Sequence, residues 1–177
     1  PPSEEEAMGL RFELSNRGGD QVLVVEELGL YRMKGAVPEG DYRVPLGQAV
    51  VVREGGDVTI AAYGSAVGRA LQAAEALEGE GVAVEVVDLR SLVPLDRETI
   101  LSSVARTGRF VMVHDAVRFG GFGAEVCAMV AEEAFGALKA PIRRVAAPNA
   151  PVPFSPAQEE AYKPGIQDIA DAVRSML

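Results

Sequence analysis

The sequence predicts an α/β fold in which an open, mostly parallel sheet lies between two layers of helices. Short apolar runs of strand length alternate with longer segments whose apolar residues recur at helical spacing. The alternation repeats about every 30 residues, the length of a strand, its crossover helix and their loops. Because crossovers of this kind join parallel strands with one handedness, we predict a three-layer domain over residues 48–177.

The residues before position 48 are less regular. We expect a helix over residues 3–16, because Ser3 and Glu6 have the spacing of a capping box and Gly18 follows the segment. Residues 21–25 have the pattern of a short strand. Residues 27–47 contain glycines and prolines without a clean period, so we interpret them as a linker.

The predicted domain contains four strands and four helices in alternation. We expect strands at residues 58–63, 82–89, 110–114 and 141–145. The expected helices run from Ser65 to Gly79 or Gly81, from the N-cap Asp96 to Gly108, and over residues 122–138 and 166–177. Four prolines within residues 146–157 predict an irregular crossing before the last helix.

Composition and charge narrow the range of partners. Acidic residues number 26 against 17 basic ones, and the formal net charge is −9. This balance argues against nucleic acid and anionic membranes and favours plain solubility or a basic protein partner. Cys127 is the only cysteine, so no intrachain disulfide can form, which fits a reducing compartment. No apolar run approaches the roughly 18 residues of a membrane span, and we expect no signal peptide before the domain.

The loop after the third predicted strand is the most informative stretch. His114 and Asp115 end that strand, and Gly120, Gly121 and Gly123 open the next helix. In open α/β folds, such loops at the carboxyl ends of strands build sites and interfaces. We therefore place a candidate interface loop here. His114 has either a structural or interface role or an acid/base role near an active site, and the first is favoured.

The other readings of these residues also stay open. The glycines could meet an anion, but a tight turn with close packing is favoured, because Val126 stands where a dinucleotide fingerprint would need its third glycine. Ser65 either caps its helix or cradles an anion, and the cap is favoured. With His114 as the only histidine, we expect no metal site, and Cys127 is expected to pack inside a helix.

Several segments, in order along nearly the whole chain, together resemble one family. They include Leu-Tyr-Arg at 30–32, Val-Pro-Leu-Gly-Gln-Ala at 44–49, Asp-Leu-Arg-Ser-Leu-Val-Pro-Leu-Asp at 88–96, Gly-Gly-Phe-Gly-Ala-Glu at 120–125 and Pro-Val-Pro-Phe-Ser-Pro at 151–156. The set resembles the carboxyl-terminal half of the beta subunit of 2-oxoacid dehydrogenase decarboxylases, which act on pyruvate, branched-chain 2-oxoacids or acetoin. The equivalent domain of transketolase or deoxyxylulose phosphate synthase is the near alternative.

The resemblance implies a division of the chain and an absence of catalytic groups. Residues 1–26 would be the end of an amino-terminal, cofactor-binding α/β domain, residues 27–47 a linker, and residues 48–177 the transketolase-type carboxyl-terminal domain. In the family, thiamine diphosphate and Mg²⁺ are held by that amino-terminal domain and by a Gly-Asp-Gly motif of the alpha subunit. None of the three Gly-Asp pairs of this chain is followed by glycine. We therefore expect no catalytic, cofactor or metal ligand in this chain, which alone would be inactive.

The resemblance also implies partners. The family assembles α2β2 heterotetramers, in which this domain would meet the alpha subunit and a second beta subunit. It would also dock the basic peripheral subunit-binding domain of the lipoyl acyltransferase, and Asp168, Asp171 and the carboxylate of Leu177 are the docking residues we expect. The family works in the bacterial cytoplasm or the mitochondrial matrix. A stand-alone interaction module and a small-molecule regulatory module remain as alternative functions.

Overall fold

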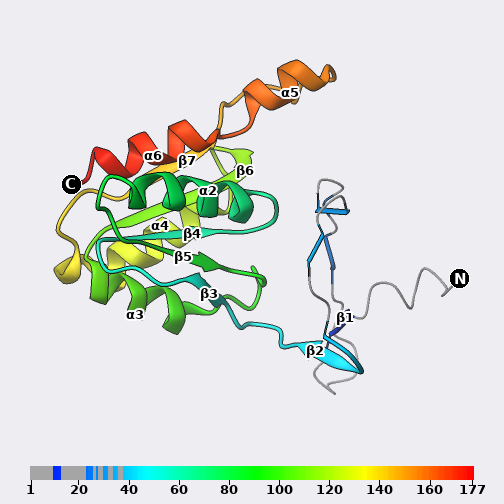
Figure 1. Cartoon of the computed structure of the whole chain (residues 1–177), viewed down its shortest axis with the longest axis horizontal. Helices are drawn as coiled ribbons and strands as arrows, with labels where there is room; N and C mark the ends of the chain where they lie inside the picture. The colour runs from blue at the N-terminus through cyan, green and yellow to red at the C-terminus, as the bar shows by residue number, and fades with distance from the viewer. Residues whose placement is uncertain (1–9, 13–22, 26, 28–29, 32–33, 36–37) are drawn as a thin grey trace, which may run out of the picture.

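The computed structural model describes residues 10–12, 23–25, 27, 30–31, 34–35 and 38–177. Its main body is a five-stranded sheet of order β3-β5-β4-β6-β7 (Figure 1). The strands are β3 (Val50–Arg53), β4 (Val58–Ala62), β5 (Val84–Asp88), β6 (Phe110–Val117) and β7 (Arg143–Ala147). β4 to β7 are parallel, and only the edge strand β3 runs antiparallel, to β5. The predicted mostly parallel sheet is confirmed.

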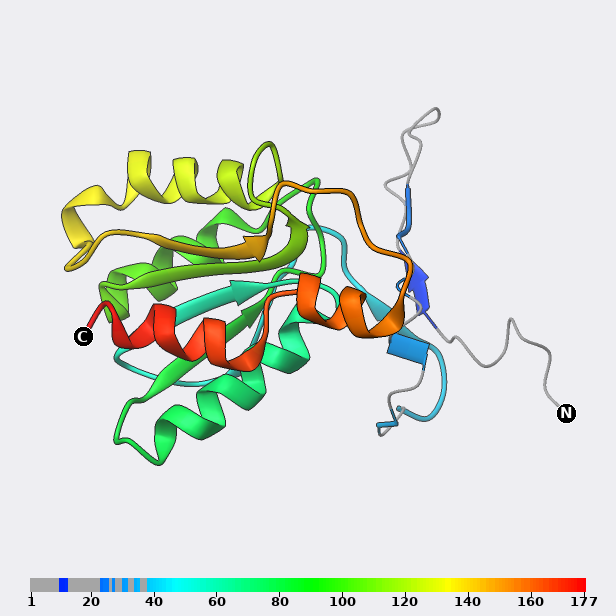
Figure 2. The same ribbon diagram turned by 90° about the horizontal axis from the view of Figure 1, so that it is seen from above.

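Helices cover both faces of this sheet, as the perpendicular view shows (Figure 2). On one face lie α2 (Ala66–Glu78) and α6 (Ile166–Arg174), and on the other α3 (Arg97–Thr107) and α4 (Gly123–Glu133). Successive strand residues point to opposite faces, so Val111 and Val113 pack under α2 and α6 while Phe110 and Met112 pack under α3 and α4. The three-layer prediction is therefore confirmed.

Two of the predicted helices differ in length from the prediction. The helix expected over residues 122–138 ends at Glu133 and tightens into the 3₁₀ turn η2 (Phe135–Ala137). The apolar period continues to Leu138, but the helix stops where Ala134 leaves helical geometry. The last helix ends at Arg174, and the proline-rich crossing contains an additional short helix, α5 (Pro156–Tyr162). The Tyr162 hydroxyl donates to the Ala150 carbonyl at 2.9 Å and ties α5 to the crossing.

The amino-terminal predictions are wrong where the structure tests them. Residues 10–12, expected within a helix, form the strand β1 (Leu10–Phe12), which pairs in parallel with β2 (Tyr42–Val44) of the expected linker. This pairing joins segments about 30 residues apart, which no local pattern shows. Residues 23–25 are irregular rather than a strand, and Leu23 and Val25 are exposed. The rest of the predicted helix and strand lies outside the described residues.

Candidate functional site at the carboxyl ends of the strands

The connections of the sheet diverge at its centre. From β4 the chain crosses through α2 to β5 on one side, and then returns through α3 to β6 on the other side of β4. Ligands of open α/β sheets bind at such a point, outside the carboxyl ends of the diverging strands. Tyr63, Gly64 and Ser65 leave β4 here, and His114 and Asp115 lie near the end of β6, where the pairing with β7 shifts register.

His114 lies inside the protein rather than at the mouth of a site. Its side chain is fully buried, and its ring stacks on that of Tyr63 with centroids 6.1 Å apart and planes inclined by 14°. Neither ring nitrogen has a hydrogen-bond partner within the described part of the chain. Burial, together with the nearby Arg144 guanidinium, lowers the pKa of His114 and favours the neutral ring. This setting favours a packing role over an acid/base role.

The three glycines of the loop allow this packing. Gly120 has a φ of +71°, a left-handed conformation that favours glycine. A Cβ on Gly121 would meet the Val117 carbonyl and the His114 ring, and one on Gly123 would meet the same ring. The geometry therefore supports the tight-turn reading of these glycines.

A polar cluster joins the two loops next to the buried ring. The Ser65 hydroxyl donates to Asp115 Oδ2 at 2.8 Å, and Arg69 of α2 forms an ion pair with the other oxygen of Asp115. The Ser65 backbone N–H donates to Glu27 Oε2 at 2.7 Å. Ser65 therefore does not cap α2 with its own hydroxyl, as was favoured from the sequence, because that hydroxyl is turned to Asp115 and a carboxylate from the linker stands at the helix terminus.

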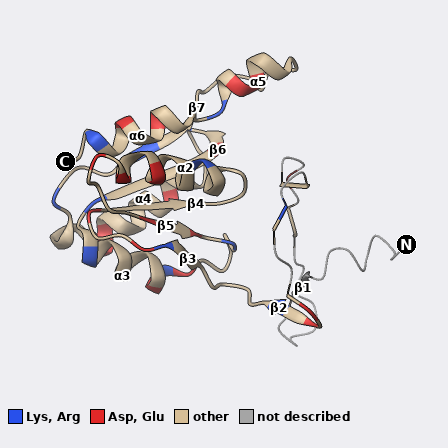
Figure 3. Cartoon of the chain, in the orientation of Figure 1, with Lys and Arg blue, Asp and Glu red and all other residues tan. Residues whose placement is uncertain are grey.

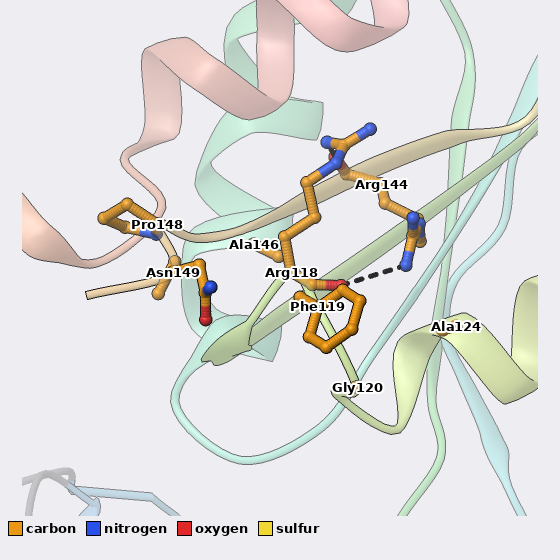
Figure 4. Close-up of a pocket in the computed structure, with 9 residues that line it drawn as sticks. Arg118, Phe119, Gly120, Ala124, Arg144, Ala146, Pro148 and Asn149 are labelled. Carbon is orange, nitrogen blue, oxygen red and sulfur yellow. Dashed lines mark hydrogen bonds between the residues drawn. The ribbon is translucent and has the colours of Figure 1, made fainter. Parts of the chain in front are cut away.

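A groove lies between the loops that follow β6 and β7 (Figure 4). Its volume is about 530 Å³, and Arg118, Phe119, Arg144 and Asn149 are among its lining residues. The guanidinium of Arg118 donates to the Arg144 carbonyl at 2.7 Å, and that of Arg144 donates back to the Arg118 carbonyl at 3.1 Å. These two reciprocal hydrogen bonds connect the end of β6 to β7.

The predicted docking residues lie on and just after α6, and Asp168 lines a second groove together with Arg118 and Arg144. Asp168 Oδ2 accepts from the Gly165 N–H at 2.8 Å and so caps its own helix. Asp171 pairs with Arg174, which also binds Glu80 of the segment after α2. Leu177 is exposed at the carboxyl end of the chain. The structure brings His114 and Asp115 together with the glycine loop, but not with these acidic residues.

The described residues contain no cluster of side chains that fits a resident metal. No group of three or more His, Cys, Asp or Glu side chains in this part of the chain could hold a metal ion. Burial raises the pKa of the Cys127 thiol to about 11, so this residue is a protonated, packed side chain of α4. Among the same residues, no helix is long and apolar enough to cross a membrane.

Comparison with models of protein families identifies the family of this chain. The model of the carboxyl-terminal domain of transketolase matches residues 47–169, more than half of the chain. The chain belongs to this family. The transketolase carboxyl-terminal domain match begins close to residue 48, where the expected domain begins, and ends within α6.

Individual relatives are consistent with the family. The acetoin:2,6-dichlorophenolindophenol oxidoreductase subunit beta of Cupriavidus necator is 45% identical over 177 residues, covering 100% of this chain and 52% of that protein. The pyruvate dehydrogenase E1 component subunit beta of Staphylococcus epidermidis is 42% identical, with 100% and 54% covered, and that of Bacillus subtilis is 41% identical, also with 100% and 54% covered. The chain thus spans about half the length of the curated relatives it matches.

A solved structure supports the same fold. It is described as the inactive β4 tetramer of a split-gene transketolase, and it superposes with a TM-score of 0.68 at 36% sequence identity. The match covers 81% of this chain and 45% of the other. The recognised resemblance to 2-oxoacid dehydrogenase beta subunits and the predicted fold are both confirmed by these comparisons.

Proposed function

We propose that this chain is the carboxyl-terminal part of the beta subunit of a thiamine-diphosphate-dependent 2-oxoacid dehydrogenase, where it serves assembly rather than chemistry. The observation that carries the proposal is the similarity of the whole chain, at 40–45% identity, to the beta subunits of acetoin and pyruvate dehydrogenases. The site geometry supports the second half of the proposal. The one histidine of the chain is buried, and its loop is shaped by packing.

The proposed partners are an alpha subunit, a second beta subunit and the peripheral subunit-binding domain of a lipoyl acyltransferase. Thiamine diphosphate and Mg²⁺ would be held by the rest of the beta subunit and by the alpha subunit, and would supply the decarboxylation chemistry there. The setting would be the bacterial cytoplasm or the mitochondrial matrix. The acyltransferase contact would depend on charge, because its binding domain is expected to be basic while this chain carries a net charge of −9.

The docking residues Asp168, Asp171 and Leu177 remain a proposal. Figure 3 shows acidic and basic residues together along the ribbon of α6, and both aspartates already have partners inside the chain. A basic partner would therefore compete with Arg174 for Asp171. Since these groups are exposed, such docking would weaken as salt screens the charges.

The proposal is tested by co-expressing the beta protein that contains this domain with its alpha subunit. We expect an α2β2 mass in sedimentation analysis. We also expect thiamine-diphosphate-dependent turnover of one of pyruvate, the branched-chain 2-oxoacids or acetoin only when both subunits are present. The chain of 177 residues by itself should bind no thiamine diphosphate in a calorimetric titration with Mg²⁺. Tight, Mg²⁺-dependent binding to the chain alone, or a failure of the two subunits to associate, would overturn the proposal.

A further inference from the structure

The amino terminus of α2 is occupied by a carboxylate from a distant part of the same chain. Glu27 Oε2 accepts the Ser65 N–H at 2.7 Å, across 38 residues of sequence. The Leu30 N–H donates to the Glu27 carbonyl at 2.9 Å, so the linker turns where its carboxylate meets the helix. The first N–H groups of a helix lack partners within the helix and have partial positive charge, so a carboxylate is well suited to this position.

Gly64 shapes the place that this carboxylate occupies. Its φ of +62° is in the left-handed region, which a side chain disfavours. In addition, a Cβ built on Gly64 would collide with Glu27 Oε2. The backbone conformation thus favours glycine where a carboxylate approaches the head of α2, whereas the contact with the flexible end of Glu27 would require only a shift of that side chain.

The charged side chains near the amino terminus of α2 have partners of their own. The partial positive charge of this helix terminus is therefore available to the Glu27 carboxylate. Another carboxylate beside Ser65, that of Asp115, is paired with Arg69 and accepts from the Ser65 hydroxyl. Lys163 of the segment after α5 is close enough for the Asp115 charge to contribute to its raised pKa, behind the larger effect of its bond to Glu159. Asp115 therefore has its own cation, Arg69, whereas the Glu27 carboxylate accepts the backbone N–H of Ser65.

We propose that Gly64, the Ser65 N–H and the first turn of α2 form a carboxylate-binding site, which the linker fills in cis with Glu27. The site lies at the point where small ligands of open α/β sheets bind. In this protein its occupant is the chain's own linker, which is thereby fastened to the carboxyl-terminal domain. This inference goes beyond the proposed function and depends on no partner subunit.

Removing the carboxylate should empty the site and allow small carboxylates to enter it. In the full chain, we expect Glu27→Ala to lower the melting temperature by about 2–8 °C, the effect of losing one helix cap in a domain of this size. Rising concentrations of sodium formate should restore the loss in a saturable way, whereas sodium chloride at the same ionic strength should not. Glu39→Ala is the matched control, because Glu39 is an exposed glutamate of the same linker.

The outcomes separate the proposal from a general effect of charge. A formate-dependent recovery that Glu27→Ala shows and Glu39→Ala lacks supports it. Equal melting temperatures for the two variants, or a loss that formate and chloride restore equally, overturns it. A second measurement follows trypsin cleavage at the exposed Lys34 of the linker. Cleavage should be faster in Glu27→Ala than in Glu39→Ala and slowed by formate, and equal rates in the two variants would contradict the fastening of the linker.

Discussion

His114 shows how a buried titratable residue makes folding depend on pH. Burial and the Arg144 guanidinium lower its pKa in the folded protein, while the unfolded chain takes up a proton near the ordinary value of about 6.5. Between these two pKa values the unfolded state binds more protons, so stability falls as the pH falls. We expect His114→Leu to flatten the loss of unfolding free energy between about pH 7 and pH 5, by up to about 1.4 kcal/mol per pH unit, in urea titrations.

A nearby substitution without a titrating group is the control for this prediction. Met112 lies in the same packing layer as His114 beside Gly123, so Met112→Leu disturbs the packing and leaves the histidine in place. Its pH profile should run parallel to that of the wild type. If the His114→Leu profile is also parallel to the wild type, another group is responsible for the pH dependence.

Glu85 and Arg106 form an ion pair whose two members differ in burial. The Glu85 side chain is 0% exposed and also accepts from the Thr59 hydroxyl at 3.3 Å, whereas Arg106 is 51% exposed. After Glu85→Gln, Arg106 can turn to water, so we expect a cost of about 1–2 kcal/mol. Arg106→Ala leaves a buried carboxylate without its cation and should cost about 3–5 kcal/mol. Urea unfolding of the two variants measures the difference.

A second ion pair, made by an arginine at the other end of α3, is the matched control. Arg97 of α3 binds Glu133, and both side chains are partly exposed to solvent. Arg97→Ala should therefore change the unfolding free energy by no more than about 1 kcal/mol. Equal losses for Arg106→Ala and Arg97→Ala would show that the burial of Glu85 does not set the cost.

The residues of the candidate site were only partly predictable from the sequence. His114, Asp115 and the glycines could be placed at a strand end, because an apolar run and a glycine turn are local patterns. Glu27 and Arg69 could not be found in this way. Their contacts to Ser65 and Asp115 span 38 and 46 residues, and only the fold brings these residues together.

At the scale of elements, α3 shows how one side chain can fix a helix and a strand together. Asp96 accepts from the Thr99 N–H at 3.0 Å, from the Thr99 hydroxyl at 2.8 Å and from the Ala49 N–H just before β3 at 2.9 Å. We expect Asp96→Ala to lower the unfolding free energy by about 1–3 kcal/mol, because it removes a helix cap and leaves the Ala49 donor unpaired. Glu98→Ala, in the same first turn, should cost no more than about 1 kcal/mol.

The cap should also be sensitive to acid. Burial raises the pKa of Asp96, but the hydrogen bonds from Thr99 and Ala49 outweigh that effect and lower it overall. The stability from this lowered pKa is therefore present above the ordinary aspartate pKa of about 3.9 and is lost as the pH falls through the folded value. In unfolding titrations at acid pH, Asp96→Ala should lack this loss. A loss equal to that of the wild type would contradict the assignment.

Element boundaries were predictable where a cap marks them and not elsewhere. Asp96 and Gly108, whose φ is +74°, were predicted as the limits of a helix. In the structure they are the N-cap and the C-cap of α3. The edge strand β3 was missed because its four residues pair with β5, more than 30 residues later. The strand expected at residues 141–145 lies at 143–147, because its position follows from its register on β6 rather than from its own pattern.

At the scale of the whole molecule, the carboxyl ends and the amino ends of the parallel strands differ in the large apolar side chains that are exposed there. Large apolar side chains follow the carboxyl ends of three parallel strands: Val93 after β5, Phe119 after β6 and Phe154 after β7, which are 87%, 80% and 102% exposed. Grouped exposed apolar side chains mark protein interfaces, and these three all follow the carboxyl ends of strands of one sheet. This end of the sheet therefore fits the assembly role that we propose, and it could not be recognised from the sequence until the strand directions were known.

The last prediction tests this carboxyl end of the sheet as an interface between copies of the chain. We expect the chain to self-associate in sedimentation velocity, and the double variant Phe119→Ser/Phe154→Ser to weaken association at least about tenfold, because a buried phenylalanine contributes about 1.5–3 kcal/mol. Both rings are exposed in the single chain, so the melting temperature of the dilute variant should stay unchanged. Phe135→Ser is the control, since Phe135 is 76% exposed but lies after α4, at the opposite end of the sheet. If this control weakens association as much as the double variant does, the interface between copies does not lie at the carboxyl ends of the strands.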